Sequence, residues 1–137
     1  MIIKRDYYLQ QLISSKSNNL IKIVTGIRIS GKSFLLFNLF HNHLIETGIN
    51  EDHIIEIALD DRLNKNLRDP DVILQHIHER IIDDKLYYII LDEVQMIDEF
   101  TDVLNSLLHI RNADVYVTGS NSKFLSKDVV TEFRGRG

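Results

Sequence analysis

A short glycine-rich stretch constrains this chain more than any other feature of its sequence. Residues 26–33 read Gly-Ile-Arg-Ile-Ser-Gly-Lys-Ser and match the pattern G-x-x-x-x-G-K-[ST]. A β-branched run at 20–24 precedes the stretch, and the apolar helical pattern of 32–47 follows it. A loop between a strand and a helix can aim its backbone N–H groups at one point, where the helix dipole adds positive charge. These features predict a phosphate-binding loop.

The residue types in this loop indicate a nucleotide with a magnesium ion. Lys32 can reach the β- and γ-phosphates, and the Ser33 hydroxyl can ligate Mg²⁺. The alternative is a glycine-rich turn with a solvated lysine, but the flanking strand and helix patterns favour the phosphate loop. The predicted nucleotide-binding residues are Gly26, Ile27, Arg28, Ile29, Ser30, Gly31, Lys32, Ser33 and Phe34.

The rest of the chain alternates between strand and helix patterns. Further strands are expected at 53–59, 86–91 and 114–118, further helices at 70–82 and 100–108, and a last helical turn or two at 126–133. Continuously apolar strands that alternate with helices predict an α/β fold, in which helices cover both faces of a mostly parallel sheet. We therefore expect the three-layer sandwich of a P-loop NTPase.

An acidic pair follows the third predicted strand. Four apolar residues, 88–91, lead directly into Asp92 and Glu93, which is the pattern of a Walker B element. The strand carries both carboxylates to the carboxyl edge of the sheet, where ligands bind in open α/β folds. Asp92 is then the second predicted magnesium residue, and Glu93 orients and polarises the attacking water. The alternative is an ordinary acidic turn. One strand fits between the two motifs, which is typical of sheets with the order 5-1-4-3-2.

Polar residues near the end of the chain complete the predicted catalytic set. Asn121 follows the fourth strand and is a candidate for contacting the γ-phosphate and the water, although Gly-Ser-Asn is also a common turn. Arg28, Arg134 and Arg136 are candidates for neutralising the transition state, and a solvated surface role is the alternative for each. The predicted catalytic residues are Lys32, Glu93, Asn121 and Arg136.

Composition narrows the remaining classes of protein. A chain of 137 residues has room for one domain, and its net charge of −4 argues against a generally basic nucleic-acid-binding surface. The absence of cysteine excludes disulfides and thiol chemistry. We find no apolar run that could span a bilayer and no signal peptide, so we expect a cytoplasmic protein without a membrane partner.

These motifs together resemble a family of prokaryotic (archaeal–bacterial) AAA-type ATPases. The resemblance covers essentially the whole chain and includes Thr25-Gly26-Ile27-Arg28, Gly31-Lys32-Ser33, the acidic motif from Tyr88 to Gln95, the segment 118–125 and Gly135-Arg136. It implies binding of ATP and ADP, Mg²⁺ as cofactor, and ATP hydrolysis that drives conformational change in attached or partner domains. The chain departs from the family at Ile29, where a second arginine is usual.

Members of the resembling family are much longer than this chain. The resemblance therefore implies that residues 1–137 are a truncated ATPase core, without the lid and the C-terminal domain. The fifth strand is expected after Gly135-Arg136 and so beyond the chain. A homo-oligomer, and a nucleic-acid or protein partner bound through the C-terminal region, are further expectations.

The sequence bears differently on two alternatives to ATP hydrolysis. A non-hydrolysing nucleotide-binding fragment or switch stays open, whereas a small-molecule kinase would need an acceptor pocket and a basic lid that the sequence does not indicate. His41 and His43 are two residues apart on a predicted helix and so point in different directions, as do His76 and His78. We therefore expect these histidines to be solvated surface residues and not metal ligands.

Overall fold

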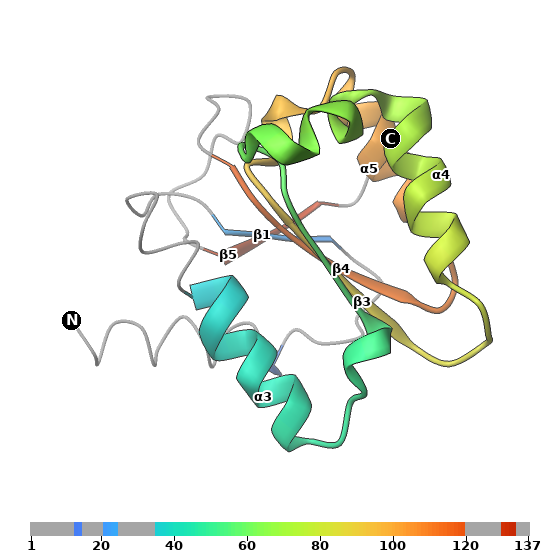
Figure 1. Ribbon diagram of the computed structural model, residues 1–137. Helices are drawn as coiled ribbons and strands as arrows, with labels where there is room; N and C mark the ends of the chain where they lie inside the picture. Colours follow the sequence, from blue (N-terminus) through green and yellow to red (C-terminus); the bar gives the residue numbers. More distant parts are fainter. Residues whose placement is uncertain (1–12, 15–20, 25–34, 120–129, 134–137) are drawn as a thin grey trace.

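The computed structural model describes residues 13–14, 21–24, 35–119 and 130–133, which have an α/β fold (Figure 1). Its strands are β1 (Ile21–Val24), β2 (Ile54–Ala58), β3 (Tyr87–Asp92), β4 (Ala113–Thr118) and β5 (Val130–Phe133). Its α-helices are α3 (His41–Glu46), α4 (Pro70–Arg80) and α5 (Phe100–Leu107). A π-helical segment (Leu35–Phe40) precedes α3, and 3₁₀ segments lie at Glu51–His53, Arg62–Arg68 and Val94–Met96.

The five strands form one sheet in the order β2-β3-β4-β1-β5. The first four strands are parallel, and β4 lies between β3 and β1. The expected α/β fold is thus confirmed, as is the order 1-4-3-2 of the four parallel strands. β5 takes the fifth position of the expected 5-1-4-3-2 order, but it is not the strand that was expected after Gly135-Arg136. Because β4 separates β1 from β3, the first predicted motif leaves the sheet two strand positions away from the second.

The fifth strand corrects two expectations. Residues 130–133 form β5, which pairs antiparallel with β1 so that Val24 lies opposite Val130 and Ile21 opposite Phe133. The helical turn expected at 126–133 is therefore wrong for these four residues, and a fifth strand lies within the chain. Val130 and Thr131 are β-branched and favour an extended backbone. The free edge of β1 supplies hydrogen-bond partners that a local sequence pattern cannot reveal.

Apolar side chains cover both faces of the sheet. The larger core, under α4 and α5, includes Ile57, Ile89 and Val117, and the smaller core, under α3, includes Phe40 and Ile90. Figure 1 shows α3 on one side of the sheet and α4 and α5 on the other. This three-layer arrangement explains why β3 and β4 are apolar along nearly their whole length.

Local capping signals place two helix ends where the sequence predicts them. The Asp69 carboxylate accepts hydrogen bonds from the N–H groups of Asp71 (2.9 Å) and Val72 (3.1 Å), and α4 begins at Pro70. Gly48 has φ 98° and follows α3, a left-handed conformation in which glycine commonly ends a helix. Most of the connection 60–69 is the 3₁₀ segment Arg62–Arg68.

A charged cluster is buried in the sheet beneath α3. The Lys22 ammonium on β1 lies 2.5 Å from an Asp114 carboxylate oxygen on β4, and the Tyr116 hydroxyl donates to the other oxygen at 2.7 Å. All three residues are at most 2% exposed. Burial, followed by the negative charge of Asp114, raises the pKa of Tyr116 far above its ordinary value. The cluster thus joins β1 to β4 through Lys22 and Asp114, which are 92 residues apart in the sequence.

Candidate active site

The candidate site lies where three neighbouring strands end. Val24 ends β1, Asp92 ends β3 and Thr118 ends β4, and the strand order makes these ends neighbours along the carboxyl edge of the sheet. Gly119 follows β4 and donates its N–H to the Val24 carbonyl at 3.4 Å. β1, the strand that precedes the predicted phosphate loop in the sequence, therefore ends at the same edge that carries the acidic pair.

Most of the predicted site residues lie outside the described part of the chain. This holds for Gly26 to Phe34, and so for Lys32 and Ser33, and it holds for Asn121, Arg134 and Arg136. Their roles stay predictions. The described residues on either side fit the expected context, because a strand ends at Val24 and a helical segment begins at Leu35.

Asp92 is held at the end of β3 by a hydroxyl from the neighbouring strand. Its carboxylate is buried and accepts a hydrogen bond from the hydroxyl of Thr118, which is itself fully buried. The same hydroxyl oxygen accepts a hydrogen bond from the Glu93 N–H at 2.8 Å. One threonine thus orients the Asp92 carboxylate and fixes the backbone of Glu93.

Glu93 adopts a backbone conformation that is rare for its residue type. Its φ and ψ angles are 57° and 54°, in the left-handed region, and the residue is 4% exposed. A left-handed residue with a Cβ costs about 1–2 kcal/mol, and strain of this kind clusters at functional sites. The turn ends the buried strand and starts the 3₁₀ segment Val94–Met96. Gln95, in that segment, donates from Nε2 to Glu93 Oε1 at 2.7 Å.

The donor set at Asp92 fits a magnesium ion held together with phosphates. Mg²⁺ is bound by hard oxygen ligands and commonly uses one or two protein carboxylates, substrate phosphates and water. Asp92 offers one oriented carboxylate at this edge of the sheet. Within the ranges that the structure describes, no group of three or more potential ligands forms a separate metal site. The Asp92 carboxylate has the chemistry of one of the oxygen ligands that such an ion uses beside phosphates and water.

Sequence reasoning missed two residues of this site, Thr118 and Gln95. The signal for Thr118 was a polar residue at the end of a strand whose other central positions are apolar, next to Gly119. Gln95 lies only two positions after Glu93, and an isolated amide at that distance carries no pattern by itself. Both roles depend on contacts that only the folded chain creates.

One of the histidines is not the solvated residue that we expected. His41 contacts the carboxylate of Glu56 on β2 through Nδ1 at 2.9 Å and that of Glu51 through Nε2 at 3.1 Å, and its side chain is 18% exposed. Burial acts to lower the pKa of His41, but the hydrogen bonds and charges of Glu56 and Glu51 outweigh it, so the pKa is raised above 6.5.

This ion pair predicts a pH-dependent stability. Because the pKa of His41 is higher in the folded chain, its contribution is complete below the unfolded value of 6.5 and is lost as the pH rises through the folded value. We expect His41→Gln to reduce the free energy of unfolding by about 0.5–1 kcal/mol more at pH 5.5 than at pH 8.5. Urea unfolding at both pH values measures the difference. An equal loss at both pH values would show that the charge of His41 does not stabilise the fold.

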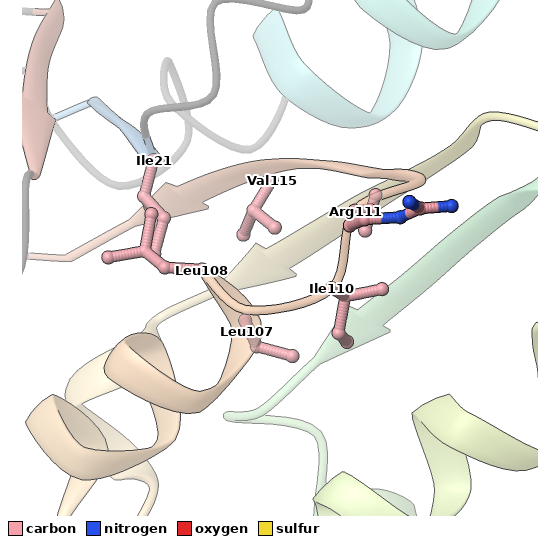
Figure 2. A pocket seen from close by; sticks show the side chains of 7 residues that line it. Ile21, Leu107, Leu108, Ile110, Arg111 and Val115 are labelled. Atoms are coloured by element: carbon pink, nitrogen blue, oxygen red, sulfur yellow. The ribbon is translucent and has the colours of Figure 1, made fainter.

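A pocket of about 220 Å³ lies at the opposite edge of the sheet (Figure 2). All its lining residues except Arg111 are apolar, and they come from α5, the turn after it and the first residues of β1 and β4: Ile21, Leu107, Leu108, Ile110, Arg111, Ala113 and Val115. Ile21 begins β1, whereas Asp92 ends β3, so this pocket does not belong to the candidate active site.

In the described part of the chain, no helix is both long and apolar enough to cross a bilayer.

Comparison with known proteins agrees with this geometry. A family model described as "AAA domain" matches residues 18–137. An uncharacterized protein of Haemophilus influenzae is 34% identical over 137 residues, which cover 98% of this chain and 34% of that protein. The uncharacterized protein MJ1544 of Methanocaldococcus jannaschii is 32% identical over 139 residues, which cover 98% of this chain and 28% of that protein. The chain thus spans about a third of the length of these relatives. No solved structure matches it significantly.

Proposed function

The chain belongs to the AAA domain family, whose members are associated with nucleotide binding and ATPase-like activity, and from this premise we propose that it binds ATP with Mg²⁺ and hydrolyses it. One observation carries the proposal. The buried Asp92–Glu93 pair is oriented by Thr118 at the sheet edge where β1 ends and the G-x-x-x-x-G-K-S stretch begins.

Each residue has a separate task in the proposed reaction. The loop from Gly26 to Phe34, which includes Lys32, binds the phosphates. Ser33 and Asp92 would hold the metal ion. When bound, Mg²⁺ supplies positive charge beside the β- and γ-phosphates. Glu93 accepts a proton from water as the water oxygen bonds to the γ-phosphorus and the bond to the ADP oxygen breaks. Asn121 is proposed to orient the water, and Arg136 to neutralise charge on the γ-phosphate.

The wider role follows only as a proposal, because the chain spans 34% and 28% of the two relatives. Residues 1–137 are proposed to be the ATPase core of a cytoplasmic machine whose hydrolysis cycle moves attached or partner domains. Further parts of such a protein would contact a second copy, a protein or a nucleic acid. Fold alone does not choose among these partners.

Nucleotide binding to the 137-residue chain and to Lys32→Ala tests the first step. Titration with a fluorescent ATP analogue should show binding that Mg²⁺ strengthens and that Lys32→Ala weakens about tenfold or more, since the phosphates lose a charged hydrogen-bond donor. Lys85→Ala, in the exposed turn before β3, is the matched control and should leave affinity unchanged. Absence of binding to the wild-type chain would refute the proposal. Binding without phosphate release would identify a nucleotide switch instead of an ATPase.

A further inference from the structure

Gln95 has a backbone position that the fold determines closely. It lies between Val94, which is fully buried, and the exposed Met96 in a single 3₁₀ turn. The Met96 N–H donates to the Glu93 carbonyl at 3.0 Å, and the Ile97 N–H donates to the Val94 carbonyl at 3.0 Å. Val94 and Ile97 anchor this turn in the larger core. The Gln95 amide therefore starts from a fixed place beside the acidic pair.

This amide and Thr118 hold Glu93 from two directions. The Thr118 hydroxyl oxygen accepts a hydrogen bond from the Glu93 N–H at 2.8 Å, and Gln95 Nε2 donates a hydrogen bond to the Glu93 carboxylate at 2.7 Å. Hydrogen bonds to ionised groups are short and strong, and a side chain held at both ends loses most of its rotamer freedom. The position of the Glu93 carboxylate is therefore set by groups on the chain itself, before any ligand contributes.

The other end of the Gln95 amide shows which contact sets its orientation. Its Oε1 atom is buried and accepts no hydrogen bond from the residues that the structure describes. A buried amide oxygen without a donor is unfavourable. The side chain nevertheless keeps this orientation, in which Nε2 faces the Glu93 carboxylate. In this orientation the donor end of the Gln95 amide, Nε2, is the end that meets the Glu93 carboxylate.

We propose that Gln95 is a positioning residue that holds the Glu93 carboxylate in the place where it deprotonates water. The inference rests on the proposed hydrolysis and deepens it. Gln95 acts through Glu93 and takes no part in binding the nucleotide. Its loss therefore lowers turnover and leaves ATP affinity unchanged.

The kinetic test uses Gln95→Met, which keeps the length of the side chain and removes the hydrogen bond. We expect kcat to fall about ten- to hundredfold, since a hydrogen bond to a charged group is lost, with KM and the Kd for ATP changed less than twofold. Gln75→Met is the control, because it makes the same change at an exposed position on α4, where Gln75 donates a hydrogen bond to Glu79 at 2.9 Å. In a Glu93→Gln background, Gln95→Met should cause no further loss. A further tenfold loss in that background, or a KM effect larger than the kcat effect, would overturn the inference.

A second measurement works without turnover and separates this inference from the proposed function. In the ¹⁵N-labelled chain, the Gln95 side-chain amide signals are identified by their loss in Gln95→Met. Glu93→Ala should shift these signals and speed their exchange with solvent, and Glu79→Ala should not. If the wild-type chain releases no phosphate but these signals respond to Glu93→Ala, hydrolysis is refuted while Gln95 still positions Glu93. If Glu93→Ala changes neither the position nor the solvent exchange of these signals, the positioning role is overturned even in an active ATPase.

Discussion

Glu93→Gln is expected to lower the rate of ATP hydrolysis by about two to four orders of magnitude while the Kd for ATP changes less than twofold. General bases typically contribute a factor of this size, and an amide of the same shape cannot accept the proton from water. The Gln95 contact should survive, because the amide oxygen of the variant can still accept a hydrogen bond from Nε2. Phosphate release at saturating ATP, together with nucleotide titration, measures the two effects separately.

The control for this variant is Glu79→Gln, which makes the same substitution at an exposed position on α4. It should leave both turnover and affinity unchanged. Normal turnover in Glu93→Gln would remove Glu93 from the mechanism. A loss of ATP affinity that matches the loss of turnover would instead mean that the substitution damages the binding site.

Asp114→Asn is expected to lower the free energy of unfolding by about 3–5 kcal/mol. The substitution removes the negative charge that lies 2.5 Å from the Lys22 ammonium, and Lys22 is fully buried. An uncompensated buried charge is far more costly than a broken surface ion pair. Urea unfolding followed by circular dichroism measures the loss, provided that the transition remains two-state.

A double variant distinguishes the charge from other effects of the substitution. Lys22→Met combined with Asp114→Asn removes both charges and keeps an acceptor for the Tyr116 hydroxyl, so it should recover most of the lost stability. Asp84→Asn, at an exposed position in the turn before β3, is the control and should change stability by less than about 0.5 kcal/mol. A loss below 1 kcal/mol in Asp114→Asn would show that the ion pair with Asp114 is not what stabilises Lys22 in the folded chain.

The parts of the fold that depend on residues close together in the sequence were predictable from the sequence. Asp69 and Pro70 mark the start of α4 because a cap acts on N–H groups two and three residues away. Gly48 marks the end of α3 because a positive φ favours glycine. The continuous apolar character of β3 indicated a strand covered on both faces. The strand order was also predicted correctly, and it places the acidic pair near the end of β1.

The contacts that complete the site were not predictable in the same way. Thr118 meets Asp92 across 26 residues of sequence, and Lys22 meets Asp114 across 92. Lys22 and Asp114 belong to no motif, and Thr118 begins the segment 118–125 without a predicted partner. Gln95 is close to Glu93 in sequence, but its contact depends on the left-handed turn at Glu93, which no residue preference predicts.

The sequence by itself determined the chemistry available to this protein: a phosphate-loop motif, an Asp-Glu pair at the end of an apolar strand, and the strand–helix alternation of an α/β sandwich. Those features are local, because they depend on residue type and spacing within one element. Only the tertiary structure decided that β5 closes the sheet against β1 and that Thr118 and Gln95 hold the acidic pair. Each of these outcomes depends on hydrogen bonds between groups that become neighbours only when the chain packs. Some of these groups are far apart in the sequence, and the others need a particular backbone turn before they can meet.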